Sequence, residues 1–201
     1  MNKKKLGTGL LALALVGVVG IGGSLAWFTD TEQATNEVSL SKVDINLTEP
    51  SWDGDVTGAL PGDLFKKDPT ITLAADSVNA WVRIAPLTVQ VDFDNNGSVD
   101  DEIKLNTQDN LDLFNIKLND GWSLNTTDGY FYYDTALSAG ESTTALFDSI
   151  TIPTGWGNAY VNAKIILDVQ AEAIQYQNTS TTSCEEAFSL ADNIADLEVT
   201  D

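Results

Sequence analysis

Histidine is absent, cysteine occurs once, and basic residues are scarce in this sequence of 201 residues. Without histidine the chain cannot form a Ser-His-Asp or Cys-His catalytic centre, an HExxH zinc site or an imidazole general base. The one cysteine, Cys184, has no partner for a disulfide within the chain, so it is either free or paired with another chain. Such low cysteine use is typical of a secreted bacterial protein that relies on core packing rather than on disulfide bridges.

Lysine and arginine total 10 residues against 30 aspartates and glutamates, which gives a formal charge of −20. Nucleic-acid binding is therefore not expected, because it depends on basic side chains that neutralise phosphates. The same charge balance argues against an anionic membrane surface as the main target. The charge is compatible with solubility outside the cell, divalent cations or basic partners. At 43% hydrophobic residues, the chain has enough apolar side chains for the core of one domain.

Residues 1–26 have the three parts of a secretory signal peptide. Lysines at positions 3–5 precede an apolar run, and the small residues Ser24 and Ala26 end it. We expect cleavage between Ala26 and Trp27, which leaves 7 basic and 30 acidic residues, a formal charge of −23. The alternative is an uncleaved anchor, because the apolar run approaches the length of a bilayer span. The glycines within the run and the polar sequence after it favour cleavage and no stable membrane anchor.

The rest of the chain alternates apolar and polar residues with the period of two that is typical of strands. Turn dipeptides such as Asn96-Gly97 separate these segments, and Pro86 indicates an edge, a bulge or a break. The pattern predicts an all-β fold, an antiparallel β-sandwich with little helix. The expected strands are 38–40, 43–47, 64–65, 70–73, 80–84, 87–91, 111–118, 122–124, 129–133, 145–152 and a long central strand, 160–176. One helix is expected at 185–197, where apolar residues recur at helical spacing.

Four segments follow from these patterns. They are the signal peptide (1–26), an N-terminal arm with the first strand (27–48), the sandwich body (49–177) and a C-terminal tail (178–201) that contains the helix.

The acidic segment 92–102 begins like the calcium loop of an EF-hand, with oxygen ligands at alternate positions and Gly97 at the sixth. The pattern departs at the twelfth position, which is Ile103, while Glu102 lies one place early. Two interpretations remain open: a Ca²⁺ site, or an acidic hairpin tip built on Asn-Gly that needs no metal. The candidate Ca²⁺ ligands are Asp92, Asp94, Asn96 and Asp100.

The aromatic residues permit two interpretations as well. Trp81, Trp122, Trp156 and residues 130–133 are able to form a platform for sugar rings, but such residues more often form the core of a sandwich.

Several segments resemble the TasA/camelysin family of exported proteins, whose leader is cut by a SipW-type signal peptidase. They are Ala-Trp-Phe-Thr-Asp-Thr-Glu after the leader (26–32), Asn-Glu-Val-Ser-Leu-Ser-Lys-Val-Asp-Ile-Asn-Leu (36–47), Leu-Pro-Gly-Asp (60–63), Val-Asn-Ala-Trp-Val-Arg-Ile (78–84) and Val-Gln-Ala-Glu-Ala-Ile-Gln (169–175). The resemblance extends to about residue 177, and the last two dozen residues have no counterpart.

The resemblance implies a jelly-roll-like sandwich and a structural role in the fibres of an extracellular biofilm matrix. Camelysin itself is classed as a metallopeptidase, but without histidine or a zinc motif this chain is not expected to be an enzyme. In fibre-forming members, the mature N-terminal segment pairs as a strand with the next subunit, so the expected partners are further copies of this chain and other matrix components. The donor strand expected here is Trp27, Phe28, Thr29, Asp30, Thr31, Glu32, Gln33, Ala34, Thr35 and Asn36. No cofactor other than Ca²⁺ is expected.

A donated strand agrees with the physical properties of the arm. An exposed sheet edge presents unpaired backbone groups that a neighbour's extended segment can satisfy. Burial of Trp27 or Phe28 contributes about 1.5–3 kcal/mol each, before the cost of ordering the arm. The alternatives are a secreted surface module that binds calcium or carbohydrate, and a camelysin-like secreted metallopeptidase, which the absence of histidine disfavours.

Overall fold

A computed structural model describes residues 42–52, 54, 58–157, 160, 163–176 and 181–198, the last five of these by their backbone only. All of them belong to one compact unit, Leu40–Asp201. The predicted signal peptide, its cleavage site and the proposed donor strand lie outside the described residues, as does the expected strand at 38–40. They remain predictions.

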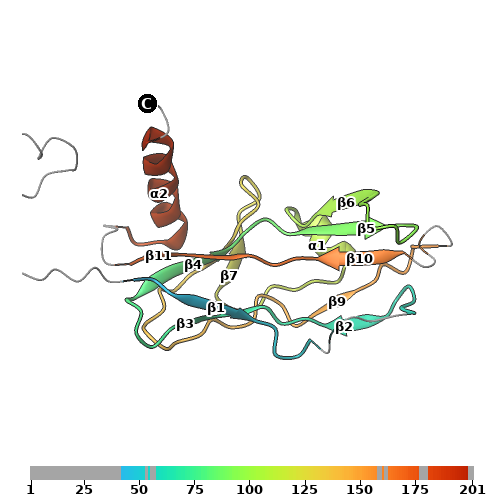
Figure 1. Cartoon of the computed structure of the whole chain (residues 1–201), viewed down its shortest axis with the longest axis horizontal. Coiled ribbons are helices and arrows are strands. Elements are labelled where there is room, and N and C mark those ends of the chain that lie inside the picture. Colours follow the sequence, from blue (N-terminus) through green and yellow to red (C-terminus); the bar gives the residue numbers. More distant parts are fainter. Residues whose placement is uncertain are drawn as a thin grey trace, which may run out of the picture. The chain divides into compact units, whose positions relative to one another are not determined.

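The described part of the chain is built from short strands and two helices (Figure 1). The strands are β1 (Ile45–Thr48), β2 (Leu64–Lys66), β3 (Thr70–Leu73), β4 (Ala80–Ile84), β5 (Thr88–Asp92), β6 (Asp101–Lys104), β7 (Trp122–Leu124), β8 (Phe131–Tyr133), β9 (Ser149–Thr151), β10 (Lys164–Leu167) and β11 (Ala171–Gln175). The helices are α1 (Gln108–Leu113) and α2 (Cys184–Glu198). Every strand pair among the described residues is antiparallel. The all-β, antiparallel prediction with little helix is confirmed.

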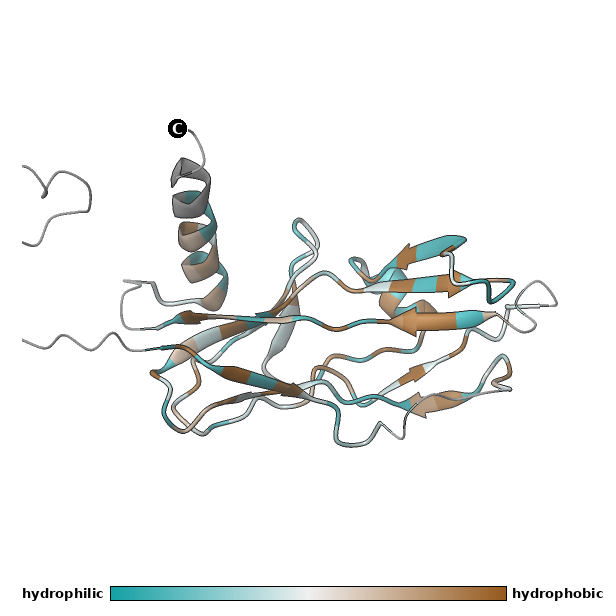
Figure 2. Ribbon diagram, in the orientation of Figure 1, coloured by the Kyte–Doolittle hydropathy of each residue, from teal (hydrophilic) through white to brown (hydrophobic). Residues whose placement is uncertain are grey.

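The strands form four small sheets, ordered β1-β3, β2-β9, β10-β5-β6 and β11-β4-β8-β7. Figure 1 shows β1, β3, β2 and β9 along the lower side of the view and the other two sheets above them. The core between them includes Ile71 and Leu73 of β3 and Val82 and Ile84 of β4, all completely buried. Figure 2 shows the underlying pattern, in which hydrophobic and hydrophilic residues alternate along the strands.

Strand β4 is buried on both faces. Its alternate residues, such as Val82, point into the main core, while Trp81 and Arg83 lie on the opposite face and are nevertheless each only 4% exposed. Helix α2 covers that face, with Cys184 and Phe188 in a second apolar cluster with Trp81. The helix predicted at 185–197 is therefore confirmed, and it begins and ends one residue further out.

The prediction of one long strand over 160–176 is wrong. The segment forms β10 and β11, which belong to different sheets, with β10 on β5 and β11 on β4. Their partner strands β4 and β5 are also separated from each other, by the segment that contains Pro86. Proline has no N–H to donate to a neighbouring strand. The strand pairing is therefore interrupted between β4 and β5 and, opposite them, between β11 and β10. Of the edge, bulge or break that Pro86 indicated, the structure shows the break, because β4 ends at Ile84 and β5 begins at Thr88. The alternation nevertheless continues across the gap, and the residues packed against the core are Ala163, Ile165, Leu167, Val169, Ala171 and Ala173.

The strand predicted at 111–118 is also wrong, because the segment begins as helix α1. The Thr107 hydroxyl oxygen accepts a hydrogen bond from the Asn110 N–H at 3.3 Å, which caps the helix. Leu111 and Phe114, three residues apart, are both buried, and Asn115 ends the turn with a φ of 51°. Short apolar runs of this kind do not distinguish helix from strand by periodicity. Two other strands, β8 and β9, are shorter than the predicted ranges 129–133 and 145–152.

Candidate functional site

The acidic segment forms the tip of the hairpin β5–β6, in which Val91 is paired with Asp101. Asp92 ends β5 and is 1% exposed. Its two carboxylate oxygens accept hydrogen bonds from the N–H groups of Asn96, at 3.1 Å, and Gly97, at 2.8 Å. Burial alone raises the pKa of a carboxyl, but these backbone donors hold the pKa of Asp92 below its usual value. Asp92 is therefore ionised at neutral pH.

The turn brings two further carboxylates to Asp92. Asp100 accepts a hydrogen bond from the Phe93 N–H at 2.8 Å, which draws the two ends of the loop together. One oxygen each of Asp92, Asp94 and Asp100 lies within 4.8 Å of the others. Three of the four predicted Ca²⁺ ligands thus converge. The fourth, Asn96, lies in the same turn, where its side-chain oxygen accepts a hydrogen bond from the Ser98 N–H at 2.7 Å.

A second feature is the incompletely covered edge of the core, which we call the open seam. It runs along β1 on one layer and along β10 and β11 on the other. Ile45 and Leu47 of β1, like the inward residues of β10 and β11, pack against the core but stay only partly buried. The neighbouring β3 and β4 residues, such as Leu73 and Val82, are completely buried. Among the described residues, β1, β10 and β11 each pair with one strand only.

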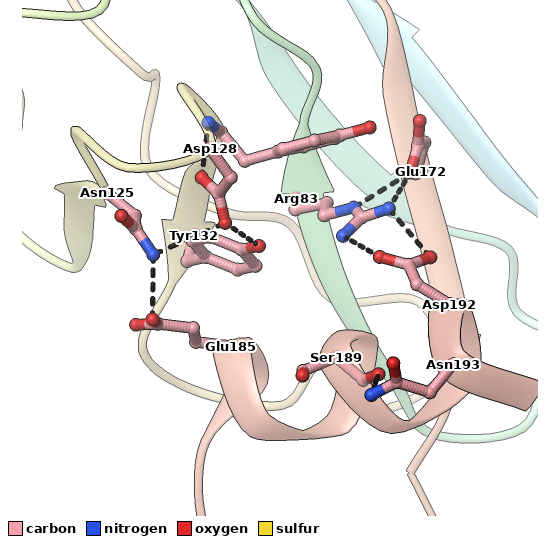
Figure 3. A network of polar contacts seen from close by, with 10 residues as sticks. Arg83, Asn125, Asp128, Tyr132, Glu172, Glu185, Ser189, Asp192 and Asn193 are labelled. Carbon is pink, nitrogen blue, oxygen red and sulfur yellow. Dashed lines mark hydrogen bonds and ion pairs between the residues drawn. The ribbon is translucent and has the colours of Figure 1, made fainter.

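A third feature is the buried Arg83 under α2 (Figure 3). Its guanidinium contacts Glu172 of β11, with N–O distances of 2.7 and 2.8 Å, and Asp192 of α2, at 3.0 and 3.3 Å. It also lies 3.8 Å from the ring centroid of Tyr130 and 4.1 Å from that of Phe188. Burial opposes the charge, but the two carboxylates outweigh it and raise the pKa of Arg83. These contacts keep the cation in place and join α2 to the sheet.

Polar contacts also join the β7–β8 connection to α2, as Figure 3 shows. The Asn125 side-chain amide donates to Asp128 at 3.3 Å and to Glu185, near the start of α2, at 2.7 Å. The Tyr132 hydroxyl donates to Asp128 at 2.9 Å. Burial, together with this bond, raises the pKa of Tyr132 to about 12. Each of these groups has a partner, so the arrangement fits a docked helix better than a reactive centre.

Cys184 is a free thiol at the first residue of α2 and is buried. Its Sγ donates to the Val82 carbonyl oxygen at 3.2 Å. Burial raises the pKa of the thiol to about 12, which keeps it protonated and unreactive at neutral pH. The sequence allows either a free thiol or a disulfide to another chain, and in this conformation the thiol is free.

The tryptophans considered as a sugar platform are interior residues. Trp122 and Trp156 belong to the main core, and the Trp122 Nε1 donates to the Thr144 carbonyl oxygen at 3.0 Å. These two rings therefore belong to the core of the sandwich and do not form a sugar-binding platform. Trp81, in the second cluster, differs, because its buried Nε1 has no hydrogen-bond partner among the described residues. It lines a hollow beside Tyr176, a residue that the sequence pattern did not single out as functional.

The described chain is thus a β-sandwich with an open seam, an acidic hairpin and a helix clamped on its outer face. Residues 1–112 match the family model described as camelysin metallo-endopeptidase. Because this match covers more than half of the chain, the protein belongs to that family, and the resemblance stated from the sequence is confirmed. Comparison with curated proteins and with solved structures gave no match.

The family description implies a metal, but the residues of this chain do not fit a catalytic zinc centre. Such centres use histidine, or cysteine with histidine, as ligands. The chain has no histidine, and its one cysteine is buried with its thiol on a backbone carbonyl. The carboxylate group at the hairpin tip offers oxygen ligands alone, which suit a hard cation such as Ca²⁺. In the part of the chain that the structure describes, neither helix has the length and apolar character needed to cross a bilayer.

Proposed function

We propose that the protein is a secreted structural subunit of extracellular matrix fibres. After cleavage behind Ala26 by a SipW-type peptidase, residues 27–36 of each subunit pair as a strand with the next subunit, and the contacts repeat head to tail. The observation that carries this proposal is the open seam, where two layers of the sandwich leave apolar side chains partly exposed. Family membership supports the proposal at a coarser level.

The seam has the properties that a guest strand requires. Its backbone is paired on one side only in β1 and in residues 171–174 of β11, so the other side offers hydrogen-bonding groups. Ala171 and Ala173 pack against the core there and stay partly buried, so apolar surface remains for a guest strand to cover. A strand that carries Trp27 and Phe28 supplies large aromatic groups for this surface and backbone partners for the edges.

Chain length permits transfer to a neighbour. About 15 residues separate Trp27 from Lys42, where the described structure begins, and they span up to about 50 Å when extended. A contact of this kind is heterologous, because donor and acceptor are different surfaces, and it therefore produces filaments rather than closed dimers. The mature charge of −23 opposes close approach, so salt, acid or divalent cations should promote assembly.

Electron microscopy of the purified mature protein tests whether the N-terminal arm, residues 27–36, is needed for fibre formation. Deletion of residues 27–36 should leave a folded monomer, by circular dichroism, that forms no fibres. The pair Trp27→Ala and Phe28→Ala should also prevent fibres, whereas the matched pair Thr29→Ala and Thr31→Ala should retain them. Fibres formed by the deleted protein would show that the arm is not the donor.

Peptidase activity is not part of this proposal, because the zinc ligands that such catalysis uses are missing. The mature protein incubated with Zn²⁺ should leave casein intact. Casein cleavage that copurifies with the protein and is lost on chelation would overturn this conclusion.

A second candidate function is calcium binding at the hairpin tip, favoured by the convergence of Asp92, Asp94 and Asp100. Three carboxylates this close repel one another, and a divalent cation between them relieves that repulsion. Calcium at this tip would also lower the charge of each subunit. Calcium binding and fibre assembly can be tested separately, because the hairpin tip and the N-terminal arm are different segments of the chain.

A further inference from the structure

Strand β10 has the features of an edge that can receive another strand. It pairs with β5 on one side, and among the described residues it has no strand partner on the other. Ile165 and Leu167 pack against the core and stay partly buried. Lys164 and Ile166 alternate with them and therefore lie on the outer face of the strand. Lys164 is exposed there, and Ile166 is only partly buried.

The amine of Lys164 is the one positive charge along the open seam. The three strands that border the seam, β1, β10 and β11, carry no other lysine or arginine. In the described part of the chain Lys164 forms no ion pair. Asp92 lies opposite it on β5 but directs both carboxylate oxygens to backbone N–H groups. Lys164 is therefore available to a carboxylate on a strand that docks at the free edge of β10.

The sequence of the N-terminal arm decides which face a docked strand turns inward. In a strand the side chains alternate, so Trp27 and Thr29 belong to one face. Phe28, Asp30 and Glu32 belong to the other face. Burial of unpaired carboxylates is unfavourable, so the face with Trp27 is the one that can cover the core. A shift by one residue would turn the carboxylates inward.

An antiparallel arrangement matches all four residues of β10. We propose that residues 27–30 of one subunit pair antiparallel with the free edge of β10 in the next subunit. The opposite residues are Trp27 and Leu167, Phe28 and Ile166, Thr29 and Ile165, and Asp30 and Lys164. Each aromatic side chain then lies beside an aliphatic one, and the carboxylate lies beside the amine. Cross-strand pairs of both kinds stabilise a sheet.

Other arrangements give a poorer match. A parallel strand with Asp30 opposite Lys164 places both aromatic residues before the start of β10. A parallel strand with Phe28 opposite Ile166 places Asp30 opposite Asp168, which is an exposed carboxylate, and like charges repel. An antiparallel shift by two residues leaves a carboxylate opposite Ile166. The inference rests on the proposed donation of the arm, and it identifies the acceptor strand and the residue that fixes the register.

Charge reversal in the full mature protein tests the pair of Asp30 and Lys164. Sedimentation measures the critical concentration for fibre formation, and circular dichroism checks that each variant is folded. Lys164→Glu should raise the critical concentration about three- to tenfold, because an attraction becomes a repulsion. Lys104→Glu, which makes the same change of charge at an exposed position of β6, should alter it by less than about twofold.

Rescue separates this pair from a general effect of charge. Asp30→Lys added to Lys164→Glu should return the critical concentration to within about twofold of the wild type. Glu32→Lys, which changes the net charge equally, should restore it less. Equal effects of Lys164→Glu and Lys104→Glu, or equal rescue by the two arm variants, would overturn this inference and leave the donation of the arm standing. A wild type without fibres, or fibres after deletion of residues 27–36, would remove the proposed function and this inference with it.

Discussion

Arg83 in β4 and Asp192 in α2 are 109 residues apart in the sequence, yet they form a two-pronged ion pair with N–O distances of 3.0 and 3.3 Å. Arg83 is almost completely buried, whereas the Asp192 side chain is 59% exposed. The pair therefore lies at the boundary between the second apolar cluster and solvent. Its two ends should contribute unequally to stability.

Replacement of Arg83 by Leu should lower the free energy of unfolding by about 2–4 kcal/mol, because it removes both carboxylate pairs and two ring contacts. Asp192→Asn should cost about 0–1 kcal/mol, since an exposed partner is already solvated. Urea unfolding followed by circular dichroism measures both. Equal decreases in the free energy of unfolding of the two variants would contradict the conclusion that Arg83 holds α2 against the sheet.

Stability should decline in alkaline solution because two buried groups hold their protons in the folded state. The pKa of Cys184 and that of Tyr132 are both raised to about 12 by burial. Their ordinary values are lower, so the unfolded chain loses these protons first and the folded state becomes less favoured as pH rises. Thermal unfolding from pH 8 to 12 should show the fall begin near pH 9. Cys184→Ala and Tyr132→Phe should each make the fall shallower, and an unchanged profile in both would contradict this account.

Calcium should bind the hairpin tip and raise the melting temperature of the mature protein. Calorimetry should record one site in the wild type and none in Asp94→Ala or Asp100→Asn, because two carboxylates without the third attract the cation less. Asp109→Asn, outside the loop, provides the matched control and should bind as the wild type does. Absence of heat in the wild type would leave the hairpin tip as a turn that needs no metal.

Cysteine pairs should locate the donated strand at the open seam. Asn46 lies in β1 with an exposed side chain, and Cys184 is too buried to interfere. Mature Asn46→Cys protein combined with a single cysteine at one of positions 29–33 should form a ladder of disulfide-linked oligomers under mild oxidation. The control pairs the same arm cysteines with Asp109→Cys and should give no ladder. Linked monomers alone would show that the arm occupies the seam of its own subunit.

Local residue patterns predicted the parts of the fold that depend on neighbours in sequence. The strands β3, β4 and β7 begin and end where the alternation places them, and α2 lies where Ala187 and Leu190 recur at helical spacing. The carboxylates of the hairpin tip could be predicted as a group for the same reason. A turn built on Asn96 and Gly97 folds its own few residues, with the ends joined by Asp100 and Phe93.

Longer-range contacts decided the remainder. The uniform alternation of residues 160–176 predicted one strand, but Pro86, more than 70 residues earlier, interrupts the partner strands and divides it. Around residue 111 the local signal itself was ambiguous, and the Thr107 cap together with burial of Leu111 and Phe114 favoured a helix. The packing of the sheets against one another also decides which edge of the core remains partly exposed. Here the apolar residues of β1 and β11 are the partly buried ones.

By itself, the sequence determined the antiparallel β class, the family, the absence of histidine chemistry and the acidic hairpin, because these depend on composition and on residues close along the chain. Only the tertiary structure decided that Arg83 is buried, that Cys184 is enclosed and that Trp81 keeps an unpartnered N–H beside Tyr176. Each of these depends on α2 or β11 meeting β4 from about 90 residues or more away. Burial and hydrogen bonding at such distances follow from packing, which no local pattern contains.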